Sequence, residues 1–317
     1  MTNSNQPAKK KYIGEGALLL ATVIWGGTFV IVKESLNDIS PMLFITFRFS
    51  LAAILLLPFV LTRKKLFNKK LLVGGSIVGL FLFLGFATQT VGLKFTSASR
   101  SGFITGAIVL FVPILQLVIA KRTPKNGAII GTVLVFLGLS FLSSGGDSIF
   151  NLFSEIGENF NFGDFMTLMC AIFFAFQIVY IDVVSRKYDF WLLTFIELSV
   201  VALLGILFTL ILDVTELEKI KLIPTDYLWF GILYTGILAT FVNISIQTKF
   251  QKEVSPTKAG IIYSFEPLFA ATFAFFLLNE KITNFGFIGG ALIFLGLLIS
   301  ESYDSVIFIY EKRFKKS

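Results

Sequence analysis

The chain has 317 residues, of which 55% are hydrophobic and 38 are phenylalanine, and its formal net charge is +7. Its mean hydropathy of +0.83 is far above the value for soluble globular domains. Because it has no histidine, a single cysteine and no G-x-x-x-x-G-K-[ST] loop, the sequence excludes Ser-His triads, Cys/His zinc motifs, a disulfide framework and ATP hydrolysis through a P-loop. We therefore expect no enzyme, no bound metal and no cofactor.

Apolar runs of spanning length follow one another along the chain, separated by short polar stretches. A helix needs about 20 apolar residues to cross the roughly 30 Å hydrocarbon core of a bilayer, and the alternating strands of a membrane β-barrel are absent from the sequence pattern. The first run has no small-residue cleavage site, so it predicts a retained helix rather than a signal peptide. The predicted spans are 16–36, 41–62, 71–93, 98–120, 126–143, 163–184, 190–212, 227–249, 256–278 and 283–302. The sequence thus predicts an all-α integral membrane protein with ten transmembrane helices.

Basic residues are distributed unevenly between the two sides that ten spans define. If the N-terminus is cytoplasmic, the cytoplasmic segments carry 20 of the 27 Lys and Arg residues, the outer segments carry 6, and Arg48 lies within a span. Cytoplasmic segments of membrane proteins are enriched in Lys and Arg. We therefore expect both termini in the cytoplasm of a multi-pass protein of the cytoplasmic (inner) membrane. The positive charge is a topology signal, so no nucleic-acid partner is expected.

The two halves of the chain resemble each other. An offset of 149 residues aligns Gly14-Glu15 with Gly163-Asp164, Trp25 with Phe174, Thr28 with Gln177 and Arg48 with Glu197. An offset of 158 aligns Gln89 with Gln247, Ser97 with Ser255, Arg100 with Lys258, Gly102 with Gly260 and Gly138 with Gly296. The nine additional residues of the second half are expected near Asp213 to Asp226. Since five spans per half is an odd number, the second half must be inverted in the membrane relative to the first, as in many transporters.

The predicted organisation follows from these spans and the repeat. It comprises a cytoplasmic tail at 1–15, a first repeat at 16–143, an outer loop at 144–162, a second repeat at 163–302 and a basic cytoplasmic tail at 303–317.

Short motifs in both halves resemble the drug/metabolite transporter superfamily, and in particular its EamA-type ten-helix permeases. The motifs are Trp25-Gly26-Gly27-Thr28-Phe29, Pro41 followed by Arg48, Thr96-Ser97-Ala98, Gly102 to Gly106 running to Pro113, Phe265-Glu266-Pro267, and Asn279-Glu280. The resemblance covers residues 13 to 302 and implies movement of small metabolites, often export of amino acids or related compounds, through a central cavity. The chain departs from the family pattern at the end of span 4, where Lys121-Arg122 replace the usual Glu.

Glu266 lies ten residues into span 9, roughly 15 Å deep and therefore at the bilayer centre. A carboxylate at that depth must be protonated, paired or facing a wet cavity. Pro267 follows directly and removes a backbone donor, which frees the carbonyl of Tyr263, and Pro113 frees Val109 in span 4 in the same way. Unpaired backbone at membrane depth is tolerated where it lines a cavity. We favour a cavity-lining, possible proton-carrying role for Glu266 over the alternative of a helix-to-helix lock.

Other polar side chains fall at similar depths and are predicted to line the same cavity. Asn243 and Gln247 share one face of span 8, and Tyr263 lies about one turn from Glu266. The alternative for each amide is an interhelical hydrogen bond with no part in transport. The complete set of predicted cavity residues is Trp25, Thr28, Gln89, Gln177, Asn243, Gln247, Tyr263 and Glu266.

Arg48 and Glu197 form a candidate buried charge pair, each roughly 10 Å from its own face of the membrane. Their depths differ by about 10 Å in a 30 Å core, so a direct salt bridge is not expected. We favour the interpretation that each is a structural lock satisfied within its own half, or extends part of the way toward its membrane face, over the alternative that both face one cavity from opposite halves.

Glycines at helical spacing predict close helix packing. Gly102/Gly106 and Gly75/Gly79 are interpreted in this way. Spans 5 and 10 are nearly free of polar residues and carry Gly127/Gly131 and Gly286/Gly290. We expect these two spans to be peripheral, either packed within the monomer or forming the seam of a homodimer.

The function predicted from these patterns is a secondary transporter of small metabolites, with the lipid bilayer and a small-molecule substrate as its partners. A channel would need a hydrophilic stripe or a ring of like charges, and neither is visible. A membrane enzyme would need a catalytic set that a chain without histidine does not offer. The alternative kept open is a lipid-linked or nucleotide-sugar carrier or scramblase of the same superfamily.

Overall fold

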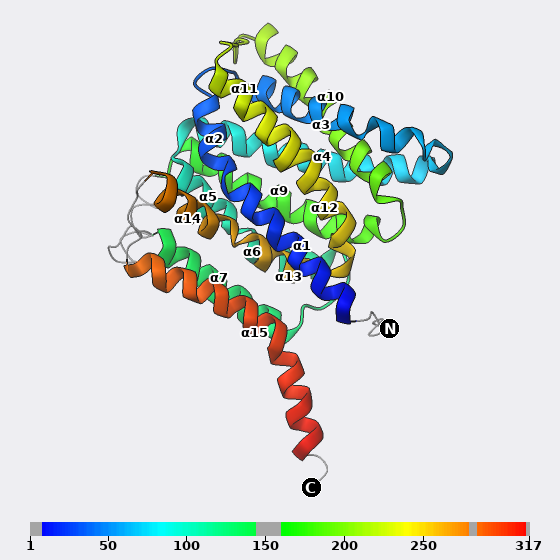
Figure 1. Cartoon of the computed structure of the whole chain (residues 1–317), viewed down its shortest axis with the longest axis vertical. Coiled ribbons are helices and arrows are strands. Elements are labelled where there is room, and N and C mark those ends of the chain that lie inside the picture. The colour runs from blue at the N-terminus through cyan, green and yellow to red at the C-terminus, as the bar shows by residue number, and fades with distance from the viewer. Residues whose placement is uncertain (1–7, 144–159, 279–283, 315–317) are drawn as a thin grey trace.

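The computed structural model describes residues 8–143, 160–278 and 284–314. The Asn279-Glu280 motif, most of the predicted outer loop and the two chain ends lie outside these ranges. Within them the fold is all-helical (Figure 1). The helices are α1 Ala8–Gly26, α2 Thr28–Ser35, α3 Pro41–Leu61, α4 Lys69–Phe95, α5 Ala98–Gly106, α6 Ile108–Val118, α7 Asn126–Ser143, α9 Phe162–Ser185, α10 Phe190–Val214, α11 Asp226–Leu233, α12 Asn243–Phe250, α13 Pro256–Tyr263, α14 Glu266–Leu278 and α15 Asn284–Phe314, with a π-helical stretch at Tyr234–Val242.

The predicted fold class, a ten-helix integral membrane protein, is confirmed. In the part of the chain that the structure describes, eight helices are long and apolar enough to cross a membrane, and α7 is a shorter apolar helix. Large apolar side chains point outward, as lipid contact requires: Leu20, Ile54, Ile114 and Leu203 are 56%, 61%, 62% and 64% exposed. The protein therefore presents apolar side chains both to its core and to the bilayer.

Local sequence explains where several of the helices begin. The Asn68 side chain accepts a hydrogen bond from the backbone nitrogen of Leu71 at the start of α4. At the start of α9, Asn161 and Asp164 each accept a hydrogen bond from the other's backbone nitrogen, which forms a capping box. Such caps satisfy backbone donors that would otherwise be unpaired in the first turn. They therefore define the membrane entry points of these two spans.

The two repeats are inverted, because equivalent spans pack antiparallel to each other. In the pair of second spans, Thr46 of α3 lies 3.5 Å from Thr209 of α10, measured between the hydroxyl oxygens. Near the other end of the same pair, Phe59 stacks on Trp191 with ring centroids 4.1 Å apart. The residue numbers rise along α3 as they fall along α10. The two equivalent helices therefore cross the membrane in opposite directions, as the odd span count predicts.

The pair of fifth spans, α7 and α15, shows the same antiparallel arrangement at one edge of the molecule (Figure 1). A Cβ added to Gly131 would lie 2.5 Å from the Gly296 carbonyl oxygen, and one added to Gly138 would lie 2.7 Å from that of Gly289. Such close approach of backbones requires glycine. Of the two interpretations of these spans, packing within one chain is the one observed.

Three spans are interrupted part-way across the membrane. Span 1 is divided at Gly27, between α1 and α2, span 4 at Ala107, and span 9 at Ser264 and Phe265. The interruptions of spans 4 and 9 occupy equivalent places in the repeats, since the 158-residue offset aligns Gly106 with Ser264. Pro113, in contrast, lies inside α6 without ending it.

The boundaries of both predicted tails differ from the structure. The first helix, α1, begins at Ala8, so about half of the predicted tail at 1–15 is helical. The last helix, α15, continues to Phe314, so the predicted tail at 303–317 is helical over most of its length. The sequence prediction ended the span where hydropathy falls, but a helix can continue beyond the hydrocarbon wherever its residues permit.

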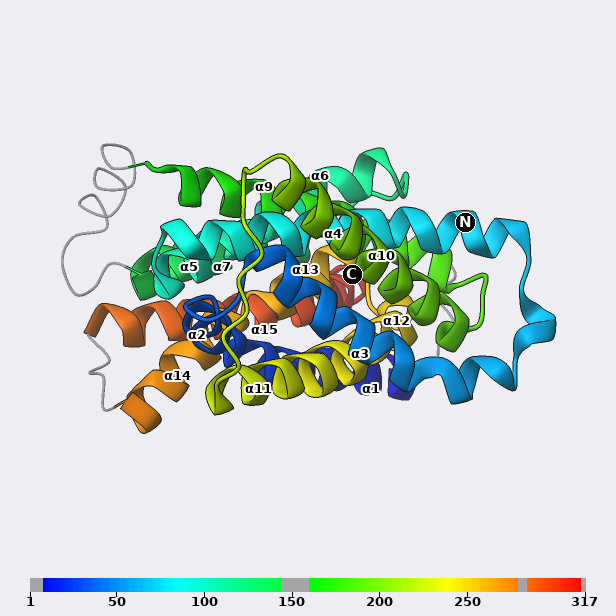
Figure 2. The same cartoon turned by 90° about the horizontal axis from the view of Figure 1, so that it is seen from above.

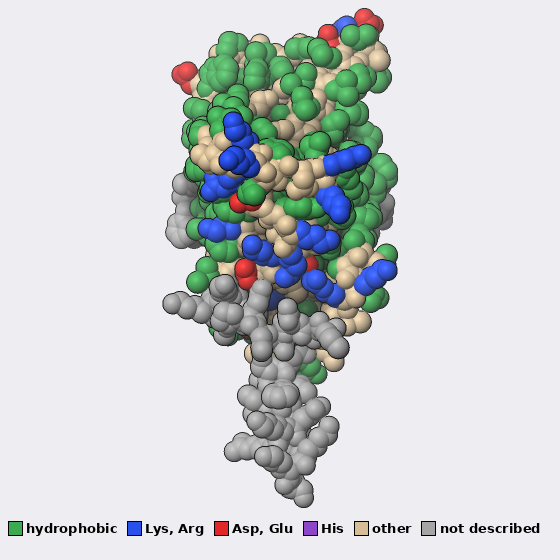
Figure 3. Space-filling view, turned by 90° about the vertical axis from the view of Figure 1, so that its right-hand side faces the viewer, with side chains coloured by type: hydrophobic (Ala, Val, Ile, Leu, Met, Phe, Trp, Pro, Cys, Tyr) green, Lys and Arg blue, Asp and Glu red, His purple; other side chains and the backbone are tan. Residues whose placement is uncertain are grey.

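The spans run between two end faces, with the α3–α4 turn at the right and α2 and α14 at the left in both views (Figures 1 and 2). Lys and Arg side chains gather on the right-hand end face, among few Asp and Glu (Figure 3). Exposed members of the α3–α4 turn and the segment after α6 include Lys64, Lys65, Lys70 and Lys121. The uneven charge read from the sequence therefore corresponds to one face of the folded molecule.

Candidate functional site

A central cavity, with about 60 Å³ of space open to a water-sized sphere, lies among α1, α2, α4, α5, α6, α9, α12, α13 and α14. Its lining includes seven of the eight predicted cavity residues, namely Trp25, Thr28, Gln89, Gln177, Gln247, Tyr263 and Glu266. The eighth, Asn243, lies outside the lining: its side-chain nitrogen donates to the Ala21 carbonyl at 2.8 Å and so joins α12 to α1.

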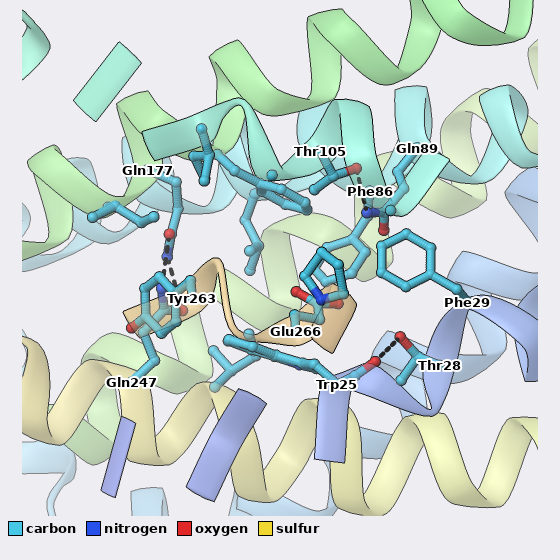
Figure 4. Close-up of a pocket in the computed structure, with 18 residues that line it drawn as sticks. Trp25, Thr28, Phe29, Phe86, Gln89, Thr105, Gln177, Gln247, Tyr263 and Glu266 are labelled. Carbon is cyan, nitrogen blue, oxygen red and sulfur yellow. Dashed lines mark hydrogen bonds between the residues drawn. The ribbon is translucent and has the colours of Figure 1, made fainter. Parts of the chain in front are cut away.

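Amide and hydroxyl groups are paired at two places in the cavity wall (Figure 4). Gln177 of α9 and Gln247 of α12 donate to each other's side-chain oxygens, with distances of 3.3 and 3.1 Å. Elsewhere in the wall the Gln89 amide donates to the Thr105 hydroxyl at 3.4 Å. Each amide keeps further donor or acceptor capacity, so the walls can still bind a polar ligand.

Trp25 and Tyr263 form an aromatic corner of the cavity. Their ring centroids are 5.6 Å apart in an edge-to-face arrangement. The indole nitrogen of Trp25 donates to the Ala239 carbonyl at 2.8 Å, and the Tyr263 hydroxyl donates to the Gln251 side-chain oxygen at 3.1 Å. Ala239 lies in the π-helical stretch, where carbonyls are displaced from regular helical pairing. Both rings are therefore held in place from outside the cavity.

Glu266, the first residue of α14, contributes the only carboxylate among the described residues that line the cavity. It is half-buried, and among the described residues no Lys or Arg nitrogen lies within ion-pairing distance of it. Figure 4 places its side chain between Trp25 and Phe86, near the middle of the lining residues. A negative group in such a place needs a proton or a cation to balance its charge.

Arg48 of α3 lies behind the cavity wall, against the ring of Phe86. Its guanidinium carbon is 4.5 Å from the centroid of the Phe86 ring, and that ring lines the cavity. Its Nε donates to the Thr240 hydroxyl at 2.6 Å. The arginine is 3% exposed, so Phe86 separates it from the ligand space while its positive charge still reaches that space.

The interpretation that Arg48 and Glu197 are each satisfied within their own half is wrong for Arg48, and for Glu197 it applies to one carboxylate oxygen, since the structure shows no partner for Oε2 among the residues it describes. Glu197 accepts a 2.6 Å hydrogen bond from Thr248, and both residues are in the second half. Arg48 is in the first half, and its partner Thr240 is in the second. The reason is that α3 packs on the π-helical stretch of span 8, which presents the threonine to it.

The cavity is built from equivalent residues of the two repeats, so it lies on the pseudo-two-fold axis. Aligned residues both line it in seven cases: Trp25 with Phe174, Thr28 with Gln177, Phe29 with Ile178, Phe86 with Ile244, Gln89 with Gln247, Thr105 with Tyr263, and Ile108 with Glu266. The last pair breaks the symmetry in charge. Glu266 of the second repeat occupies the position that Ile108 occupies in the first.

Several lining residues were missed by sequence reasoning. Thr105 and Phe174 are the repeat mates of predicted residues, so the offset contained a signal for them. No sequence pattern indicated Phe86, because one phenylalanine among 38 is not distinctive. Gly102 was interpreted as a packing glycine but lines the cavity, and a Cβ there would meet nothing nearer than Phe29 at 3.9 Å.

A single family model, that of the EamA-like transporter family, matches residues 12–144 and again residues 161–301. The two matches correspond to the two repeats and together cover nearly all of the chain. The chain belongs to the EamA-like transporter family. This EamA protein is therefore a multi-pass membrane transporter rather than an enzyme, as its sequence predicts.

Similar proteins span almost the same length. An uncharacterized transporter of Archaeoglobus fulgidus is 32% identical over 92% of this chain and 86% of its own. YoaV, an uncharacterized transporter of Bacillus subtilis, is 24% identical over 89% and 94% of the two chains. YedA, an uncharacterized inner membrane transporter of Escherichia coli, is 23% identical over 90% of each. A crystal structure with 16% identity has a TM-score of 0.71, covering 91% of this chain and 95% of its own, which shows that the fold is shared.

Proposed function

We propose that this EamA protein is a secondary exporter of small amino-bearing metabolites, such as amino acids or related compounds. The observation that carries the proposal is the central cavity, which pairs one carboxylate with amides and aromatic rings on the axis of an inverted repeat. Inverted repeats allow a cavity to open to either side when the two halves exchange conformations. The export direction is the one that the EamA resemblance implies.

The chemistry of the lining supports the substrate class. Glu266 offers a negative partner for an ammonium group, and the faces of Trp25 and Tyr263 attract cations and apolar side chains alike. Gln177 and Gln247 can bind the polar groups of the substrate. Among the described residues that line the cavity there is no Lys or Arg, so a nucleotide sugar or a lipid diphosphate would contact the Glu266 carboxylate without a cation in direct contact to bind its phosphates.

Glu266 is also the group that would couple export to the proton gradient. A carboxylate in a cavity shielded from water carries either a proton or the ammonium group of the substrate, so the two compete for one site. Proton entry from outside would displace the substrate, and substrate binding from the cytoplasm would release the proton. The chain has no P-loop to supply another energy source.

The orientation proposed for the membrane puts the basic end face of Figure 3 in the cytoplasm. Both termini would then be cytoplasmic. The cytoplasmic membrane is the expected location, in keeping with the inner membrane named for the Escherichia coli relative.

Transport into inverted membrane vesicles tests the proposal. Vesicles that contain the protein should accumulate an amino acid or a related amine from a metabolite panel when an acid-inside gradient is applied. Accumulation of only anionic sugar nucleotides or lipid-linked substrates would contradict the substrate class.

The variant Glu266→Gln separates proton coupling from passive transport, because it keeps size and hydrogen bonding but removes titration. We expect at least a tenfold loss of pH-driven accumulation with unchanged insertion into the membrane. If the Gln variant still concentrates substrate in a pH-dependent way, Glu266 is not the proton carrier.

A further inference from the structure

Two ion pairs on either side of the cavity are related by the repeat. Arg100 of α5 pairs with Asp164 of α9 at 2.7 Å, and Lys258 of α13 pairs with Glu15 of α1 at 2.5 Å. The offset of 158 residues aligns Arg100 with Lys258, and the offset of 149 aligns Asp164 with Glu15. The two ion pairs are therefore equivalent: each joins the same cationic position of one repeat to the same carboxylate position of the other repeat.

Both pairs are largely removed from water. The Asp164 and Lys258 side chains are 0% and 6% exposed, and those of Arg100 and Glu15 are 20% and 16% exposed. Asp164 also accepts a 2.8 Å hydrogen bond from Thr96. Removing one partner of a buried pair leaves an uncompensated charge, which is far more costly than losing a surface ion pair.

Each pair joins the two halves of the protein. Arg100 belongs to the first half and binds a carboxylate of the second, while Lys258 belongs to the second half and binds a carboxylate of the first. Lys258 additionally pairs with Glu301 of α15. If the two halves move apart at one end of the cavity, the ion pair at that end is therefore broken.

The pairs lie at opposite ends of the ligand space. Glu15 and Lys258 are near the start of spans 1 and 9, which enter the membrane from one side, while Arg100 and Asp164 are near the start of spans 4 and 6, which enter from the other. Arg100 precedes the cavity residue Thr105 by five positions, and Lys258 precedes Tyr263 by the same number. Five residues of helix correspond to about 7.5 Å.

We propose that these two ion pairs are alternately broken latches, which control access to the cavity from the two sides. The pair Lys258–Glu15 closes the end that bears the basic face, and the pair Arg100–Asp164 closes the opposite end. Opening toward one side breaks the latch there and keeps the other formed. Both ion pairs are formed in this structure, and one of them is broken in each conformation that is open to one side. This inference rests on the alternating access of the proposed function, but not on the identity of the substrate or on proton coupling.

Cysteine labelling tests the latches without any substrate. Cys170, the single native cysteine, is replaced by Ala, and Gly102→Cys is introduced as a reporter, because Gly102 lines the cavity and a Cβ there meets nothing nearer than Phe29 at 3.9 Å. A membrane-impermeant maleimide is applied to right-side-out and to inside-out vesicles, and the labelling rate from each side is measured.

The two latch variants should change the ratio of cysteine labelling from the two sides in opposite directions. Lys258→Ala should raise labelling from the predicted cytoplasmic side and lower it from the outside, each at least threefold, and Arg100→Ala should do the reverse. The conservative variant Arg100→Lys leaves Asp164 and its hydrogen bonds in place and should keep the parental ratio, which controls for misfolding. The latch assignment is overturned if both single variants shift the ratio in the same direction, or if neither shifts it. Labelling from neither side in any variant would overturn alternating access through this cavity itself, and the latches with it.

Discussion

At the scale of single residues, the buried arginine behind the cavity depends on one hydroxyl. The Thr240 oxygen accepts the Nε hydrogen of Arg48, and both side chains are almost fully buried. A buried donor that loses its acceptor keeps its desolvation cost without the bond that offset it. Thr240 thus allows a full positive charge to be kept in the protein interior next to an aromatic wall.

The variant Thr240→Val should lower the free energy of unfolding by about 1–3 kcal/mol, since it leaves a charged donor unpaired. Thermal unfolding in a fixed detergent would show this as a lower Tm. The matched control is Thr235→Val, because Thr235 is equally buried but its hydroxyl bonds only to carbonyls of its own helical segment. An equal fall in Tm for both variants would mean that the bond to Arg48 is not what Thr240 contributes.

At the scale of elements, the α7–α15 pair shows how glycine determines helix contact in this fold. The backbones meet at Gly138 and Gly289, where a Cβ added to Gly289 would lie 2.5 Å from both the Gly138 carbonyl oxygen and the Leu142 nitrogen. Contacts with backbone atoms cannot be relieved by a change of rotamer. The two helices would have to separate along their length.

Gly289→Ala should therefore lower stability by about 1–3 kcal/mol, the usual cost of overpacking a tight contact. Gly16→Ala is the control, because a Cβ there meets nothing within 4 Å, and alanine in a helix is favoured over glycine by up to about 1 kcal/mol. The expected result is a lower Tm for the first variant and an unchanged or higher Tm for the second. A neutral Gly289→Ala would show that the α7–α15 contact is loose in the membrane.

At the scale of the whole molecule, both termini are predicted on the side of the basic end face. Cysteines introduced at Ser4 and Ser317, each in a chain whose Cys170 is replaced by Ala, should not react with an impermeant maleimide in intact cells and should react after permeabilisation. The physical reason is the uneven distribution of Lys and Arg over ten spans. Labelling of either cysteine in intact cells would overturn the predicted orientation.

The architecture of this protein was readable from its sequence because apolar runs, charge asymmetry and internal repetition are properties of whole segments. Arg48 lies within span 2 and Glu266 lies in the cavity wall, as the sequence predicted. The partner of Arg48 could not be read, because it depends on how α3 packs against a π-helical stretch that no local pattern revealed. Gly102 was misinterpreted for the same reason: a glycine that lines a cavity and a glycine that packs a helix look alike until the neighbouring helices are in place.

The pairing of Glu266 with Ile108 across the axis has a consequence for what the cavity can hold. Two identical halves would offer any asymmetric molecule two equally good poses, related by a half-turn. A single carboxylate removes that degeneracy, because an ammonium group finds its counter-charge on one wall alone. Under the proposed function, an ammonium-bearing substrate would therefore keep one orientation in the cavity. The end that enters the cavity first from one face would then also leave first at the opposite face.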